Sequence, residues 1–320
     1  MKVHGRRFRC QGLVLLAFFC CVAAPRCLTA AVVYVNRGAT GANDGSSWDD
    51  AFTHLQEGID AAAVGDQVWV AEGTYRPNDL DPANLDRQQS FALKNGVAIY
   101  GGFAGIETAV DERDPTSHPV ILSGDLRGDD EGTDDDGQVD SQWEDNAFHV
   151  FFHPAALALD ATARIDSITV YGGRATGPGC HGYGGGLYND HCSPTVSNSM
   201  FVSNVAGWDG GAIYNIHSSP IVQGCTFLYN AAAGWGGGGI CNEYSSPEVR
   251  NCTFAHNRGY NDGGGIYNRH SSPTITNCTF TDCKADYVGA LYNDAESAPT
   301  VANCIFWNNS ATTTAGEIYN

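Results

Sequence analysis

The sequence predicts an all-β protein, a parallel β-helix of stacked coils with a short helix capping its N-terminal end. The segment GGAIYNIHSSPIVQGCTFLYN, residues 210–230, has near copies on both sides within residues 184–320, at steps of about 26 residues. The copies lack a helical period, and each holds three short β-type runs separated by Gly, Ser-Ser-Pro and Asn. Gly also makes up 39 of the 320 residues, as many tight turns require.

Two residue types mark the phase of the repeat. Equivalent strands of successive coils pair about 4.8 Å apart, so equivalent side chains form columns. We expect the phenylalanines to form a core column and the asparagines to bond through their amides from coil to coil, satisfying turn backbone. The marker residues are Asn189, Asn215, Asn242, Asn268, Asn293, Phe201, Phe227, Phe254, Phe280 and Phe306.

The chain ahead of the regular coils has its own pattern. Residues 31–75 alternate between strand-like and helix-like segments, with Phe52, Leu55 and Ile59 as the apolar stripe of a short helix. A lone amphipathic helix at this position covers the open end of a solenoid. We therefore expect one β-helix domain over residues 31–320, with the cap and first coil in 31–75 and regular 26-residue coils in 184–320.

The first 30 residues have the pattern of a secretory signal. Four basic residues precede the apolar run GLVLLAFFCCVAA, and small residues follow near Ala30. An uncleaved anchor is the alternative, but the run is short for a bilayer. No second apolar stretch of membrane length follows, so we expect a secreted, extracellular or cell-surface protein whose mature chain does not span a membrane.

The chain is strongly acidic. The net charge is −19, and removal of residues 1–30 leaves 12 basic and 36 acidic residues, a net charge of −24. Such a chain repels nucleic acid, which excludes that class of partner. Polyanionic glycans are also poor ligands unless a cation bridges them.

Eight cysteines lie beyond the signal segment. Cys225, Cys252, Cys278 and Cys304 follow the repeat spacing, which favours a stacked column over a disulfide framework. Cys180, Cys192, Cys241 and Cys283 lie off that column, and the sequence does not pair them.

An acidic surface loop, GDLRGDDEGTDDDGQVDSQWED, interrupts the pattern at residues 124–145. Asp134, Asp136 and Asp140, with Gly137 for a turn, resemble a Ca²⁺ site because that ion binds carboxylate and carbonyl oxygens. The spacing of a complete EF-hand loop is missing, so an acidic loop without metal is the alternative.

The repeats resemble those of known surface proteins. GGAI at residues 210–213, with FVSN, FLYN, FAHN and FWNN in successive copies, resembles the GGAI and FxxN repeats of chlamydial polymorphic outer-membrane proteins. More broadly, the chain resembles bacterial secreted proteins of the pectate-lyase-like superfamily. That resemblance implies a right-handed β-helix. FTDC at residues 280–283 and the single Gly of YVGAL depart from the pattern.

Aromatic residues near one bend are candidate glycan contacts. Trp208 and Trp235 stand seven residues before their marker asparagines, and Tyr260 and Tyr287 fall near the same bend. Aromatic faces along a groove stack on sugar rings. The alternative is that these rings fold over the turn as a lid.

Catalytic signals are sparse. His181, in CHGYGGG at residues 180–186, faintly resembles the GHG motif of polygalacturonases, but the accompanying Asp motifs are missing. A pectate-type lyase needs a base, usually Lys or Arg, and Ca²⁺, and neither Lys94 nor Lys284 lies in a recognisable motif with carboxylates at coil spacing. We therefore predict a scaffold that binds polysaccharides or cell-surface proteins. A polysaccharide lyase or glycoside hydrolase is the competing hypothesis.

Overall fold

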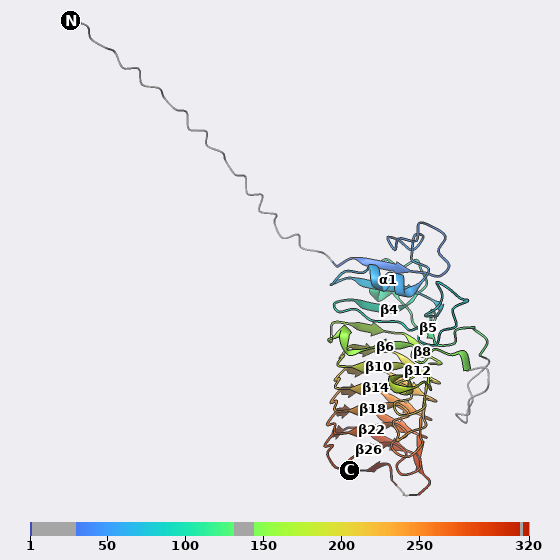
Figure 1. The fold of residues 1–320 in the computed structure, drawn as a ribbon, viewed down its shortest axis with the longest axis vertical. Helices are drawn as coiled ribbons and strands as arrows, with labels where there is room; N and C mark the ends of the chain where they lie inside the picture. Colours follow the sequence, from blue (N-terminus) through green and yellow to red (C-terminus); the bar gives the residue numbers. More distant parts are fainter. Residues whose placement is uncertain (2–29, 131–143, 314–315, 320) are drawn as a thin grey trace.

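Short β-type runs separated by turn residues stack coil upon coil along one axis (Figure 1). The computed structural model describes residues 1, 30–130, 144–313 and 316–319. They form a right-handed parallel β-helix of about nine turns, which confirms the predicted fold class. The predicted signal segment lies outside the described residues except for its two ends.

Two longer sheets, A and B, form part of the wall among the described residues. Sheet A contains β1 (Val32–Val35), β2 (Gln67–Ala71), β4 (Ala98–Phe103), β7 (Arg164–Asp166), β11 (Thr195–Ser197), β15 (Ile221–Gln223), β19 (Glu248–Arg250), β23 (Thr274–Thr276) and β27 (Thr300–Ala302). Sheet B contains β3 (Gly73–Tyr75), β5 (Val120–Ser123), β8 (Thr169–Tyr171), β12 (Met200–Val202), β16 (Thr226–Leu228), β20 (Thr253–Ala255), β24 (Thr279–Thr281) and β28 (Ile305–Trp307).

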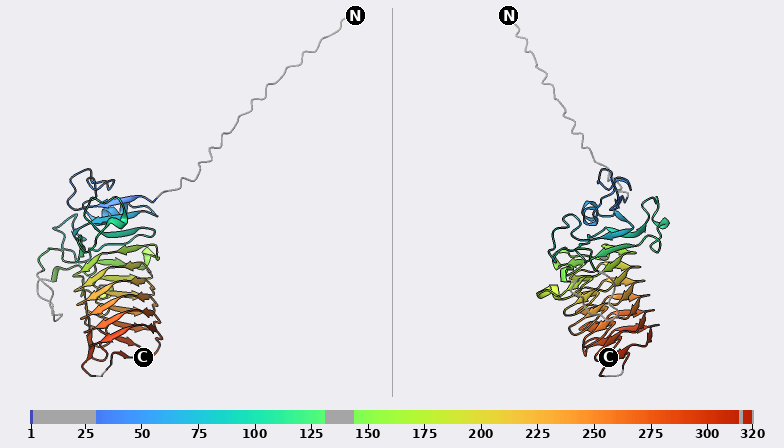
Figure 2. Two further views of the ribbon diagram at one scale, coloured as in Figure 1. Left: turned by 180° about the vertical axis from the view of Figure 1, so that it is seen from behind. Right: turned by 90° about the vertical axis from the view of Figure 1, so that its right-hand side faces the viewer.

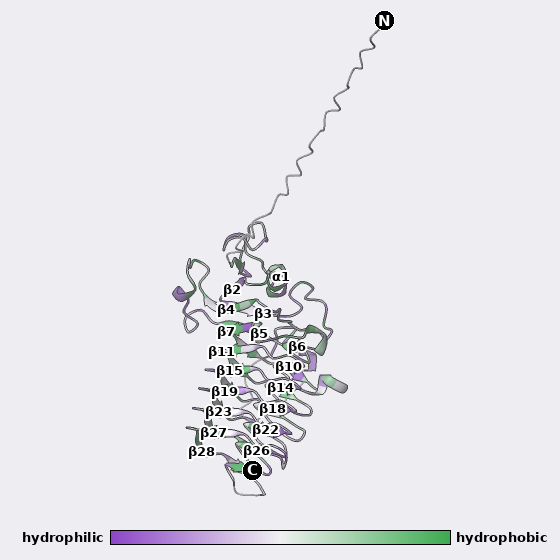
Figure 3. Ribbon diagram, turned by 90° about the vertical axis from the view of Figure 1, so that its left-hand side faces the viewer, coloured by the Kyte–Doolittle hydropathy of each residue, from purple (hydrophilic) through white to green (hydrophobic). Residues whose placement is uncertain are grey.

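Two further sheets, C and D, complete the described wall. Sheet C contains β6 (Phe151–His153), β10 (Leu187–Asp190), β14 (Ile213–Ile216), β18 (Ile240–Glu243), β22 (Ile266–Arg269), β26 (Leu291–Asn293) and β30 (Ile318–Tyr319). Sheet D contains β9 (Arg174–Ala175), β13 (Val205–Ala206), β17 (Ala231–Ala232), β21 (Arg258–Gly259), β25 (Lys284–Ala285) and β29 (Ser310–Ala311). Figure 3 shows sheets A and C along opposite edges of the column.

The core column consists of superposed phenylalanines. Phe227 lies 5.1 Å from Phe201 and 4.6 Å from Phe254 between ring centroids, and the planes of Phe227 and Phe254 differ by 4°. The stack continues at 4.7 Å to Phe280 and 4.8 Å to Phe306. This spacing is that of neighbouring parallel strands, so each coil repeats the packing of the one before it.

A ladder of buried amides runs beside this core. Asn189 donates its side-chain N–H to Asn215 at 2.9 Å, and Asn215 donates to Asn242 at 2.9 Å. Asn242 donates to Asn268 at 2.9 Å, and Asn268 to Asn293 at 2.7 Å. All five amides are fully buried, where an unpaired amide would cost free energy.

The described helices are short and lie outside the regular coils. Helix α1 (Leu55–Ala61) packs on β1 and β2 at the N-terminal end of the column, where Leu55 and Ile59 are buried (Figure 2). A Cβ on Gly58 would lie 2.5 Å from a methyl group of Val35, so this helix needs glycine to approach the sheet. The described 3-10 helices are η1 (Val110–Glu112), η3 (Ala155–Leu157) and η4 (Gly179–Gly182).

None of the described helices has the length and hydropathy of a membrane span. All eight cysteines beyond the signal segment are free thiols. Cys225, Cys252 and Cys278 are buried, and Cys304 is partly buried.

Candidate functional site

The double glycine found in most copies of the repeat shapes the loop that leads from sheet D to sheet C. Gly210, Gly237 and Gly263 have φ of +68°, +70° and +52°, a left-handed conformation that favours glycine. A Cβ on Gly211 would lie 2.4 Å from the carbonyl oxygen of Ala231. The loop therefore packs closely on the adjacent coil, and the residues just before it, including Trp208 and Asp209, lie beside the outer face of sheet C.

A column of mostly aromatic residues lies on the outer side of sheet C, where Tyr188, Tyr214 and Tyr267 are largely buried. Tyr188 pairs in register with Tyr214 on the neighbouring strand, and their rings are 5.7 Å apart. Farther along, Tyr292 stacks on Tyr319 with ring centroids 4.9 Å apart and an interplanar angle of 7°. The in-register positions of sheet C, from β6 to β30, are Phe152, Tyr188, Tyr214, Cys241, Tyr267, Tyr292 and Tyr319.

The four predicted glycan-contact residues are all about half exposed, but they do not form one cluster. Trp208 lies 6.4 Å from Tyr183 between ring centroids, beside the aromatic column. Trp235 and Tyr287 line one cavity, whereas Tyr260 lines another. Their exposed fractions are 52% for Trp208, 55% for Trp235, 56% for Tyr260 and 48% for Tyr287.

A cavity lies beside the end of the aromatic column. It has a volume of about 560 Å³, within the usual range for ligand pockets. Four aromatic residues contribute to its lining together with Asp262, a carboxylate that is 7% exposed. The aromatic residues are Trp235, Tyr287, Tyr292 and Tyr319.

Two buried carboxylates lie along the same face. Asp209 accepts hydrogen bonds from the backbone N–H groups of Trp235 at 2.7 Å and Gly236 at 3.0 Å. Burial nevertheless raises the pKa of Asp209 to about 6. Burial, assisted by the charge of Asp209, raises the pKa of Asp262 to about 6 as well. Near neutral pH, such carboxyl groups exchange protons readily, as acid–base chemistry requires.

A third carboxylate on this face is already paired. Glu243 accepts a hydrogen bond from the hydroxyl group of Tyr214 and lies 3.4 Å from the guanidinium of Arg269. Burial of Tyr214, the nearby Cys241 and this hydrogen bond raise the pKa of the Tyr214 phenol, so its hydroxyl keeps its proton. Glu243, Tyr214 and Arg269 therefore form a fixed polar cluster at the middle of the sheet C face.

His181 lies at the other end of the aromatic column. Nδ1 of His149 donates to the carbonyl oxygen of Gly184 at 2.9 Å because that oxygen can only accept. His149 Nε2 is then an acceptor for His181 Nδ1 at 3.1 Å, which leaves Nε2 of His181 as the unprotonated nitrogen. Burial lowers the pKa of both rings. His181 also stacks on Phe148 at 5.0 Å.

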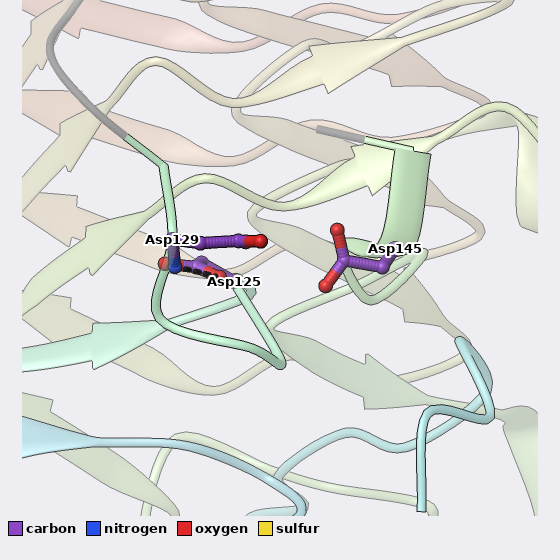
Figure 4. A group of neighbouring side chains, drawn as sticks. All are labelled: Asp125, Asp129 and Asp145. Carbon is purple, nitrogen blue, oxygen red and sulfur yellow. Dashed lines mark hydrogen bonds between the residues drawn. The ribbon is translucent and has the colours of Figure 1, made fainter. Parts of the chain in front are cut away.

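The predicted metal ligands Asp134, Asp136 and Asp140 lie outside the described residues. At the base of the same loop, Asp125, Asp129 and Asp145 bring carboxylate oxygens within 4.8 Å of one another, with Asp145 facing the other two across a gap (Figure 4). Burial and the charge of Asp129 raise the pKa of Asp145. These oxygens fit a hard cation, although Asp125 already accepts backbone N–H groups of Gly128 and Asp129.

Sequence reasoning missed the aromatic column and the raised carboxylates. The signal for the column was the tyrosine directly before the marker asparagine in most copies. The pKa shifts of Asp209 and Asp262 come from how tightly the loops pack, and the sequence carries no separate signal for that.

Comparisons with known proteins identify the fold. The family described as "Right handed beta helix region" matches residues 155–319. The crystal structure of pectate lyase Pel9A is similar, with a TM-score of 0.43 and 11% sequence identity over 90% of this chain and 68% of that chain. At that level the likeness carries no argument about activity. No curated protein matches the chain.

Proposed function

This chain belongs to the right-handed β-helix family, and we propose that it is a secreted or cell-surface scaffold that binds polysaccharide on the outer face of sheet C. The observation that carries the proposal is the cavity of about 560 Å³, which is lined by Asp262 together with Trp235, Tyr287, Tyr292 and Tyr319. Aromatic rings provide stacking surfaces for sugar rings. A carboxylate accepts hydrogen bonds from sugar hydroxyl groups.

The length of the face suits a linear ligand. The tyrosines of the column are largely buried, but Trp208, Trp235 and Tyr287 are about half exposed on three different coils beside it, so a polymer lying along the axis can contact rings on more than one coil. The GGAI and FxxN repeats, similar to those of chlamydial outer-membrane proteins, and the signal-like N-terminus support a location at the cell surface. A surface protein is the other class of partner that the same face fits.

Affinity electrophoresis of the chain in gels containing neutral polysaccharides tests the proposal. Because loss of one stacking ring removes about 1–2 kcal/mol, Trp235→Ala is expected to weaken binding about 5- to 30-fold. Trp307→Ala removes a 71% exposed tryptophan from sheet B and serves as the matched control. Equal retardation of both variants and the unchanged protein would reject the proposed site.

The polysaccharide lyase or glycoside hydrolase remains a second candidate because Asp209 and Asp262 have pKa values of about 6 beside the cavity. Glycoside hydrolysis uses two carboxyl groups as acid and base; of these two, Asp262 lines the cavity. Release of reducing ends that is abolished by Asp262→Asn would support the enzyme. Unsaturated uronate absorbance would identify a lyase instead. Binding without either product would favour the scaffold.

We further propose that Ca²⁺ binds Asp125, Asp129 and Asp145, since the ion would offset the repulsion among three adjacent carboxylates. Calcium is then expected to raise the melting temperature of the chain, and Asp145→Asn is expected to remove most of that increase. Asp111→Asn, an exposed carboxylate away from the cluster, is the control. An increase that is the same in both variants would contradict the site.

A further inference from the structure

A second groove lies over sheet D, separate from the aromatic face of sheet C. Its volume is about 450 Å³, and its lining draws on four successive coils, from Tyr229 to Thr312. No residue lines both this groove and the cavity around Asp262. The groove therefore runs along the solenoid axis as an independent surface.

Two adjacent cations form the floor of the groove. Arg258 in β21 pairs in register with Lys284 in β25, and both side chains are exposed. Like charges directly opposite each other on neighbouring strands are unfavourable. In a chain of net charge −19, such a pair is expected to attract an anionic group.

Two further basic residues of the regular coils form ion pairs. Arg250 pairs with Glu248, and Arg269 with Glu243. Within the part of the chain that the structure describes, Lys284 has no carboxylate within 4 Å. The charges of His256 and Lys284 help to lower the pKa of Asp282, and Lys284 is exposed to a ligand in the groove.

Aromatic rings form the walls of the groove. Tyr229 and His256 stack with ring centroids 5.0 Å apart and an interplanar angle of 16°. Tyr260, which is 56% exposed, belongs to the same lining. Rings beside a cationic floor suit a sugar that carries an acidic group, because the C–H face of the sugar contacts the rings while the acid reaches the cations.

Two carboxylates limit how much negative charge the groove accepts. Asp282 and Asp286 stand two residues before and two residues after Lys284 and line the same groove. Asp282 accepts hydrogen bonds from Thr281 and Asn308, which lower its pKa, and Asp286 accepts one from Thr312 at 2.9 Å. Both therefore repel a second anionic group placed next to the first.

We propose that this groove binds a glycan carrying one isolated carboxylate or sulfate group, with the acidic group between Arg258 and Lys284 and a sugar ring against Tyr229 and His256. A densely charged polyuronate fits poorly, because its neighbouring carboxylates would meet Asp282 and Asp286. The site is independent of the polysaccharide face proposed on sheet C.

Isothermal titration of the full chain tests this with four probes. They are an oligosaccharide with one carboxylated sugar, the same oligosaccharide with one sulfate ester instead, the neutral parent, and polygalacturonate. At least one singly charged probe is expected to bind about tenfold or more tightly than the neutral parent, since a charge-assisted contact is the added interaction. The two charged probes show which acidic group is accepted. The preference for the charged probe over the neutral parent is expected to fall as the salt concentration is raised.

Variants test whether the tighter binding of the singly charged probe arises in this groove. Lys284→Met, alone or with Arg258→Met, keeps the aliphatic packing and is expected to abolish the preference, whereas Lys284→Arg restores it. Arg250→Met is the matched control outside the groove and is expected to retain it, as is Trp235→Ala. Melting curves verify that each variant is folded.

Three results would overturn the inference. They are a wild-type chain without preference for either singly charged probe, polygalacturonate binding more tightly than both, or a preference that survives Lys284→Met with Arg258→Met. Loss of the preference in Trp235→Ala alone would assign acid recognition to sheet C and reject this groove while leaving the sheet C proposal standing.

Discussion

At the scale of single residues, Asp209 shows how close packing changes chemistry. The residue is 5% exposed, and burial moves its pKa from an ordinary 3.8 to about 6 despite two backbone hydrogen bonds. Ionised Asp209 is therefore less favourable in the folded state than in the unfolded chain. Its protonated form favours folding, and this contribution is lost as the pH rises from about 4 to about 6.

Asp209→Asn keeps an acceptor oxygen without the charge. It is expected to be about 2–3 kcal/mol more stable than the unchanged protein at pH 8 and nearly equal to it at pH 4, because two pKa units correspond to about that energy. Urea denaturation at both pH values measures the difference. A difference in the free energy of unfolding that stays constant with pH would show that the charge of Asp209 is not the cause. Asp111→Asn, which removes one exposed carboxylate, is the control.

At the scale of the element, the amide ladder fixes the register of sheet C. Asn242 receives a hydrogen bond from Asn215 and donates one to Asn268, and all three amides are fully buried. The fixed phase of these asparagines is visible in the sequence, and so is that of the phenylalanine stack. The repeat therefore predicted which residues occupy equivalent rungs.

Asn242→Ala is expected to leave one donor and one acceptor unpaired in the core, at a cost of about 2–5 kcal/mol. In a solenoid the damage is concentrated near the altered coil. Amide hydrogen exchange should therefore accelerate most in β14, β18 and β22. Asn261→Ala, which removes a partly exposed amide, is the control. Uniform acceleration along the whole column would contradict a local role.

The loops between strands were less predictable than the strands. Steps between marker asparagines vary from 25 to 27 residues, and this variation lies outside the strand registers. Tyr260 and Tyr287 fall near the same bend in the sequence, yet they line different cavities. A shift of one residue in a loop changes which side of the loop an aromatic ring occupies, and hydrophobic periodicity does not encode that shift.

At the scale of the whole molecule, stacking converts a short motif into long surfaces. The coils stack along one axis (Figure 1), and most of them add one ring to the aromatic column of sheet C, while Arg258 and Lys284 occupy in-register positions of sheet D. The net charge of −19 acts over both surfaces and disfavours polyanions. Within that field, sheet C suits neutral sugar chains, and the pair of Arg258 and Lys284 suits an isolated acidic sugar.

The most direct test of the polysaccharide-binding proposal is a crystal structure of the chain with the neutral oligosaccharide that it binds best. The proposal predicts sugar rings in the cavity beside Trp235, Tyr287 and Tyr319, with a hydroxyl group bonded to Asp262. Sugar bound instead on sheet A or sheet B, with that cavity filled only by solvent, would contradict it.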